Sequence, residues 1–192
     1  ISSMDNPDEG EVVFEGIDVY KLSESELSKF RLNKMGFVFQ NSQMLKNLSI
    51  FDNIILPGMV AKRESIEVVR ARATELMSKM GIEDIKDRDI REVSGGQLQR
   101  AAICRAMINS PEILFMDEPT GALNSEAASQ VMEILKKLNQ EGISIMLVTH
   151  DAKMASMAKK VIYIKDGKLA GEIKLSNEKE ALAELDLWLK TI

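Results

Sequence analysis

The chain has 192 residues, of which 45% are hydrophobic and 29% are charged, which is typical of an ordinary globular domain. Its net charge of −5 disfavours nucleic acid as a partner, because phosphate binding needs a basic surface. The single Cys104 excludes an internal disulfide, and no apolar run approaches the roughly 20 residues of a membrane-spanning helix, so we expect a cytoplasmic domain.

The first part of the chain predicts strands, short turns and one helix. Strands are expected over 11–14 and 17–20, joined by a glycine turn. Ser23 and Glu26 have the spacing of a capping box, so a short polar helix should begin there. The apolar run 35–39 then predicts a strand that is buried on both faces.

Residues 41–110 predict a helical subdomain. Ser49 can cap its first helix, which a Pro-Gly pair at 57–58 should interrupt. Apolar residues at three- and four-residue spacing indicate a second helix over 66–80, and a third is expected over 96–109.

The remainder alternates strands and helices. Asp166 followed by Gly167 is a strong hairpin signal between two of the strands. Strands are expected over 113–116, 143–148, 161–164 and 168–175, and helices over 125–141, 151–159 and about 177–191, the last capped by Asn177. This alternation predicts an α/β fold with a mostly parallel sheet, in which 1–40 and 111–176 form the core and 41–110 is an inserted helical subdomain.

Two carboxylates follow the strand predicted over 113–116. In open α/β sheets ligands bind beyond the carboxyl ends of the strands, which is where Asp117 and Glu118 stand. One carboxylate there can hold Mg²⁺, and the other can orient and deprotonate a water. The alternative is an acidic pair that caps the next element. Gln40 and His150, the only histidine, also follow predicted strands, although a lone loop histidine has no necessary function.

A glycine-rich helix start precedes this acidic strand by one helix. Ser94, Gly95 and Gly96 offer backbone N–H groups and a hydroxyl, which suit an anion, and Gln97 follows them. A plain glycine turn is the alternative. No G-x-x-x-x-G-K-S/T loop, which would cradle the phosphates of a nucleotide, occurs in the sequence.

In combination and in this order, these residues resemble an ATP-binding-cassette (ABC) ATPase. Gln40 resembles the Q-loop residue of that family, 93–97 its signature motif and 113–118 its Walker B strand with the catalytic glutamate. Residues 121–124 resemble the D-loop, with Asn124 where an aspartate is usual, and His150 resembles the H-loop histidine.

The resemblance implies a RecA-like P-loop NTPase core that binds ATP and Mg²⁺. It implies that two such domains pair head to tail as a homodimer, with Ser94, Gly95, Gly96, Gln97 and Asn124 at the nucleotide of the partner. Gln40 would contact the nucleotide and the metal, Asp117 would bind the metal, and Glu118 and His150 would be catalytic. The missing Walker A loop, together with a chain that begins at Ile1, suggests an incomplete reading frame, and without that loop the chain should be inactive.

The motifs further resemble the ATPase subunits of lipoprotein-releasing, macrolide-export and antimicrobial-peptide-export systems, and the C-terminal segment with Trp188 resembles the peptide-export branch. ATP hydrolysis would then drive export or release of a peptide, lipoprotein or hydrophobic compound through a separate permease at the inner face of the bacterial membrane. The permease should dock near Gln40, where Leu48, Ile50 and Phe51 are expected to offer apolar surface. The alternatives are an ABC ATPase acting on nucleic acid or ribosomes, and a non-catalytic regulatory cassette.

Overall fold

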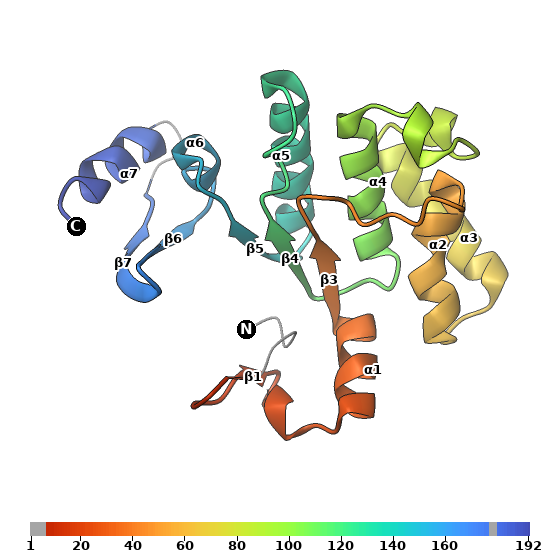
Figure 1. Ribbon diagram of the computed structural model, residues 1–192, viewed down its shortest axis with the longest axis horizontal. Coiled ribbons are helices and arrows are strands. Elements are labelled where there is room, and N and C mark those ends of the chain that lie inside the picture. Colours follow the sequence, from red (N-terminus) through yellow and green to blue (C-terminus); the bar gives the residue numbers. More distant parts are fainter. Residues whose placement is uncertain (1–6, 177–179) are drawn as a thin grey trace. The chain divides into compact units, whose positions relative to one another are not determined.

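The computed structural model describes residues 7–176 and 180–192, which form two compact units, Ile1–Met146 and Leu147–Ile192, each described by itself (Figure 1). In the first unit the elements are β1 (Val13–Phe14), β2 (Ile17–Asp18), α1 (Glu24–Lys34), β3 (Met35–Val38), α2 (Ile50–Ala61), α3 (Ile66–Lys79), α4 (Gly95–Met107), β4 (Ile113–Asp117) and α5 (Ser125–Gln140). Strand β5 (Ser144–Val148) begins in the first unit, and α6 (Ala152–Ala155), β6 (Lys160–Lys165), β7 (Lys168–Lys174) and α7 (Ala181–Leu189) belong to the second.

The central sheet has the order β3-β4-β5. Strands β3 and β4 are parallel, with Gly36 opposite Leu114 and Val38 opposite Met116. The N–H of Ser144 donates to the carbonyl of Glu112 at 3.0 Å, so β5 begins at the same edge as β4. This is the α/β arrangement that the alternating pattern predicted.

The two faces of the pair β3–β4 differ. Leu114 and Met116 are buried, and Gly36 packs so closely that a Cβ would lie 2.7 Å from the carbonyl oxygen of Ala106 in α4. On the other face the rings of Phe37 and Phe115 stack with centroids 5.5 Å apart, and both are half-buried. The last turn of α4 therefore packs directly on β3.

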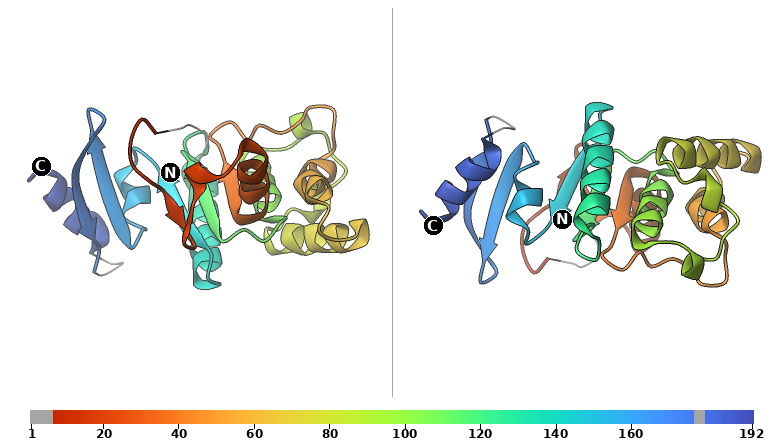
Figure 2. Two further views of the ribbon diagram at one scale, coloured as in Figure 1. Left: turned by 90° about the horizontal axis from the view of Figure 1, so that it is seen from below. Right: turned by 90° about the horizontal axis from the view of Figure 1, so that it is seen from above.

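Helices α2, α3 and α4 form a bundle beside β3 (Figures 1 and 2). Their starts follow local signals: Ser49 caps α2 by accepting the N–H of Asp52 at 3.1 Å, and Ser94 caps α4. In the same way, α1 begins with the predicted capping box of Ser23 and Glu26.

The prediction that Pro57 and Gly58 interrupt α2 is wrong, because the helix continues to Ala61. A proline inside a helix removes one backbone donor, but packing offsets the loss here. A Cβ on Gly58 would lie 2.6 Å from a methyl group of Val69, so α2 and α3 are in close contact, and Asn109 donates to the Pro57 carbonyl at 3.2 Å.

The expected apolar surface at Leu48, Ile50 and Phe51 is also wrong in part. Ile50 and Phe51 are 0% and 5% exposed, because the first turn of α2 lies in the core of the bundle, and Leu48 is half-buried. Leu45, one turn earlier in the chain, is the exposed apolar residue of this segment, at 50%.

The second unit is a hairpin with two helices. Asp166 and Gly167 have φ values of 51° and 74° and join β6 to β7, as predicted. Helix α6 is shorter than expected, because Lys159 pairs with the sheet by accepting the N–H of Leu175 at 3.1 Å. Trp188 of α7 packs edge-on against a strand tyrosine, and the expected cap Asn177 lies outside the described residues. No helix in the described ranges is long and apolar enough to cross a membrane.

Candidate functional site

Gln40 and Glu118 lie at the same edge of the sheet. Val38 is opposite Met116 in the parallel pair. Gln40 follows Val38 by two residues, just as Glu118 follows Met116 by two residues. The amide nitrogen Nε2 of Gln40 lies 3.3 Å from the position that a Cβ on Gly121 would occupy. Gln40 therefore contacts the turn that follows Glu118, as expected for residues at the carboxyl ends of neighbouring parallel strands.

The backbone at Glu118 is in the left-handed region, with φ 44°. This conformation costs a non-glycine residue roughly 1–2 kcal/mol. It is held by a turn, because the carbonyl of Glu118 accepts the N–H of Gly121 at 3.1 Å, and by the burial of Pro119 and Thr120. Strain of this kind concentrates at functional sites, and here it falls on the predicted base.

Asp117 and Glu118 offer the donor set of a magnesium site. Asp117 is exposed at the end of β4, Glu118 is half-buried, and the Gln40 amide reaches the turn beside them. Carboxylate and amide oxygens are ligands that Mg²⁺ prefers, with water and substrate phosphates completing its shell. The described residues hold no group of three or more His, Cys, Asp or Glu side chains that could bind a metal alone, so a site here would depend on such further oxygens.

The start of α4 presents free donors. Ser94 donates its N–H to Oε1 of Gln97 at 3.0 Å and accepts the N–H of Gln97 at 3.2 Å, which completes a capping box. Among the described residues, the N–H groups of Gly95 and Gly96 have no hydrogen-bond partner. Unpaired N–H groups in the first turn of a helix attract anions, and α4 with its 13 residues has a substantial dipole.

The start of α4 faces the start of α5 across a cavity of about 360 Å³. A Cβ on Gly96 would lie 3.1 Å from the Cβ of Ala127, and Asn124 caps α5 by accepting the N–H of Ala127 at 2.8 Å. The cavity is lined by Ser94, Gly95, Gly96, Arg100, Ala122, Leu123, Asn124, Glu126, Ala127 and Gln130. The structure thus brings the predicted residues 94–96 and Asn124 to one concave surface.

The model of the ABC transporter family matches residues 1–121 of this sequence. The chain belongs to the ABC transporter family. Its resemblance to that family, inferred above from the motifs, is confirmed, and so is the fold: the structure superposes with a TM-score of 0.84 on the dimeric, ADP- and phosphate-bound cassette MJ0796, which is 39% identical over 92% of this chain and 78% of that one.

Two relatives indicate the kind of ABC protein. The ABC transporter ATP-binding protein YxdL of Bacillus subtilis is 40% identical over 96% of this chain and 72% of its own length. The macrolide export ATP-binding/permease protein MacB of Campylobacter jejuni is 41% identical over the whole chain, which spans only 29% of that relative. The chain is therefore an ABC ATPase domain.

The remaining predicted site residue, His150, lies in the second unit. It follows β5, is exposed, and precedes Asp151, whose carboxylate caps α6 by accepting the N–H of Lys153 at 2.8 Å. It is thus at the predicted place after a strand, and its catalytic role stays a prediction.

Two other side chains, Cys104 and Arg105, have structural roles. Burial raises the pKa of the Cys104 thiol to about 12, which makes it an unreactive core residue. Arg105 donates to the carbonyls of Ser42 and Gln43 at 2.6 and 2.8 Å and so holds the loop after Gln40.

Two residues whose hydrogen bonds hold the loops before α2 and α4, Asn53 and Asp89, were not identified from the sequence. Asn53 is 1% exposed and interrupts the apolar face of α2, and a polar residue in such a face is the signal that could have identified it. Asp89 is half-buried, and its three-residue spacing to Glu92, which is that of a capping box, is the signal that could have identified it.

Proposed function

We propose that this ABC domain hydrolyses ATP to drive export or release of a peptide, lipoprotein or hydrophobic compound through a separate membrane permease. The observation that carries this proposal is the joint placement of Gln40 and the strained Glu118 at one edge of a parallel sheet. The name of MacB, a macrolide export protein, supports the export direction. Because the chain spans a minor part of MacB, the activity of the whole transporter is itself part of the proposal.

Glu118 is the proposed general base. Its carboxylate would take a proton from the water that attacks the γ-phosphorus as the bond to the β-phosphate oxygen breaks. Asp117 and Gln40 would hold Mg²⁺, which when bound neutralises developing phosphate charge. His150 would donate a hydrogen bond to a phosphate oxygen.

The free N–H groups of Gly95 and Gly96 are proposed to bind the ATP of a second copy of this domain. Ser94 can add its hydroxyl proton, since the hydroxyl oxygen only accepts in the capping box, and Gln97 and Asn124 hold the two helix starts in place. The dimeric state of the similar MJ0796 cassette supports a head-to-tail homodimer.

In this proposal residues 1–40 and 111–176 form the catalytic core, 41–110 the helical subdomain and about 177–191 a C-terminal helix. The permease docks on the loop after Gln40, where Leu45 is exposed, and holds the domain at the inner face of the bacterial membrane. The net charge of −5 supports a protein partner and not nucleic acid.

The test compares Glu118→Gln with Glu133→Gln in the full-length protein, because Glu133 is an exposed glutamate on α5 away from the site. Glu118→Gln should bind Mg-ATP normally, hydrolyse it about 10²–10⁴-fold more slowly and accumulate as an ATP-bound homodimer. Glu133→Gln should behave as wild type. Hydrolysis by Glu118→Gln at the parent rate would overturn the base assignment. A parent protein that binds ATP without hydrolysing it would favour a regulatory cassette.

A further inference from the structure

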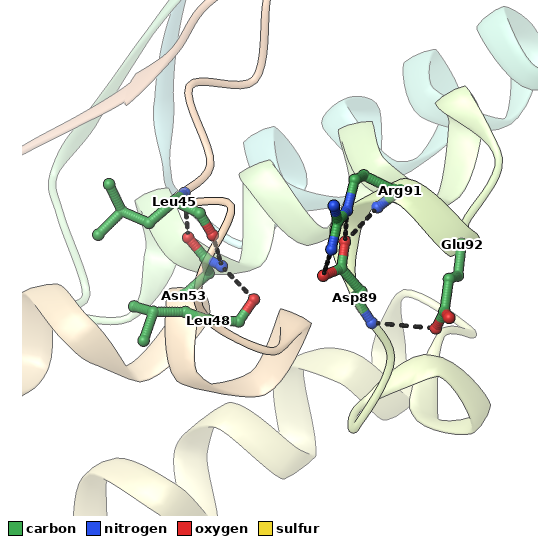
Figure 3. Close-up of polar contacts among 6 residues, drawn as sticks. All are labelled: Leu45, Leu48, Asn53, Asp89, Arg91 and Glu92. Atoms are coloured by element: carbon green, nitrogen blue, oxygen red, sulfur yellow. Dashed lines mark hydrogen bonds and ion pairs between the residues drawn. The ribbon is translucent and has the colours of Figure 1, made fainter.

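A buried amide fixes the loop that follows Gln40. The side chain of Asn53 in α2 accepts the N–H of Leu45 at 2.7 Å and donates to the carbonyls of Leu45, Leu48 and Ser49 at 3.0, 3.3 and 3.0 Å (Figure 3). An asparagine side chain has two N–H donors and one carbonyl acceptor, so every polar group of Asn53 is used. The loop 45–49 is therefore held against the first turn of α2.

The same turn of α2 is bonded to the loop that precedes the signature motif. The N–H of Ile50 donates to the carbonyl of Arg88 at 3.0 Å, and the N–H of Phe51 donates to that of Lys86 at 2.9 Å. Ser49 and Asp89 form an antiparallel bridge, and the cation of Lys86 lies 5.6 Å from the centre of the Phe51 ring. The free N–H groups of this helix start are thus satisfied by the loop 86–89.

Asp89 continues the connection toward Ser94. Its carboxylate accepts the N–H of Arg91 at 2.9 Å and pairs with the Arg91 guanidinium at 2.7 Å, while its own N–H donates to Glu92 at 3.3 Å (Figure 3). These bonds form the capping box of the 3₁₀ helix Ile90–Glu92, and Val93 alone separates that helix from the cap of α4. Hydrogen bonds therefore link the exposed Leu45 to the loop 86–92, and the backbone continues through Val93 to Ser94.

We propose that Asn53 is a positioning residue for the signature motif. Asn53 fixes the loop 45–49 on the first turn of α2, and this turn is bonded to the loop 86–92. The position of the loop 86–92 in turn determines the position of Ser94 and of the N–H groups of Gly95 and Gly96. A displacement of Leu45 by a docked permease is then passed to the phosphate-binding helix start. The inference rests on the proposed function in taking Gly95 and Gly96 as ligands of a second copy's ATP.

Hydrogen exchange tests the connection without using activity. Asn53→Ala should speed exchange at Leu45 and across 86–97 by about tenfold or more, because bonds of roughly 1.4 kcal/mol in total are lost. The matched control is Asn109→Ala: its amide donates to the carbonyls of Leu32 in α1 and Pro57 in the second half of α2, so only amides near these two residues should respond. Unchanged exchange over 94–97 in Asn53→Ala would overturn the proposal.

A functional readout separates positioning from nucleotide binding. In the full-length protein, Asn53→Ala should bind Mg-ATP as a monomer with unchanged affinity and show ATP-dependent pairing weakened by about tenfold, whereas Asn109→Ala should pair normally. Asp89→Ala, at a half-buried position in the loop before α4, should weaken pairing in the same way. Normal pairing of Asp89→Ala and of any folded Asn53→Ala overturns the inference. Absence of pairing in the wild type would instead overturn the proposed function.

Discussion

The left-handed backbone at Glu118 predicts an inverted glycine–alanine preference. Glu118→Gly and Glu118→Ala both remove the carboxylate, so their difference in stability reports the Cβ alone. At an ordinary position alanine is the more stable by about 0.5–1 kcal/mol, because glycine loses more freedom on folding. At φ 44°, a Cβ costs roughly 1–2 kcal/mol, and the following Pro119 restricts the backbone further. Glu118→Gly should therefore be the more stable variant by about 0.5–1 kcal/mol.

Urea unfolding followed by far-ultraviolet circular dichroism measures this difference. Glu133, exposed in the middle of α5, supplies the control pair, in which Glu133→Ala should be more stable than Glu133→Gly by about 1 kcal/mol. The opposite signs of the two pairs are the diagnostic result. A Glu118→Ala variant more stable than Glu118→Gly by the ordinary value of about 0.5–1 kcal/mol would show that the turn carries no strain, and would remove that argument for a functional role.

Three further predictions concern stability and reactivity. Gly36→Ala should destabilise the fold by about 1–3 kcal/mol in the same denaturation assay, because its Cβ meets the backbone of α4, and an unchanged midpoint would contradict the packing described. The Cys104 thiol, with its pKa raised to about 12 by burial, should react with a maleimide at pH 8 only after unfolding, so rapid labelling of the native chain would refute its burial. Arg91 lowers the pKa of Asp89 to about 2 from an ordinary value near 3.8. The stability difference between wild type and Asp89→Asn should therefore have its full value above pH 4 and decrease toward pH 2. A difference that increases as the pH falls would contradict the ion pair.

Signals confined to a few neighbouring residues predicted the structure well. The capping box at Ser23 and the turn at Asp166 and Gly167 are confirmed, because the bonds or φ values that define them involve only adjacent residues. The buried β4 with Asp117 at its end is also confirmed, since a short apolar run followed by acids has few other solutions in an α/β protein.

The features that the sequence did not predict depend on contacts between residues far apart in the chain. Pro57 signals a helix end, yet contacts with α3 and α4 carry α2 past it. Ile50 and Phe51 follow a loop and seemed available to a partner, but the distant loop 86–89 covers the helix start that they form. Asn53 differs, because its partners are close in sequence, and the turn of the loop 45–49 back onto α2 brings them to its side chain.

The close approach of α4 and α5 affects how mutations in the signature motif are interpreted. A Cβ added at Gly96 would lie only 3.1 Å from the Cβ of Ala127. A Cβ added at Gly95 would lie 3.5 Å from its nearest neighbour, a methyl group of Leu123, which is an ordinary contact distance. A substitution at Gly96 would push two helices apart as well as crowd the proposed phosphate site, so a loss of function there would combine two causes. Gly95→Ala, which leaves the helix pair in place, is the cleaner probe of nucleotide contact.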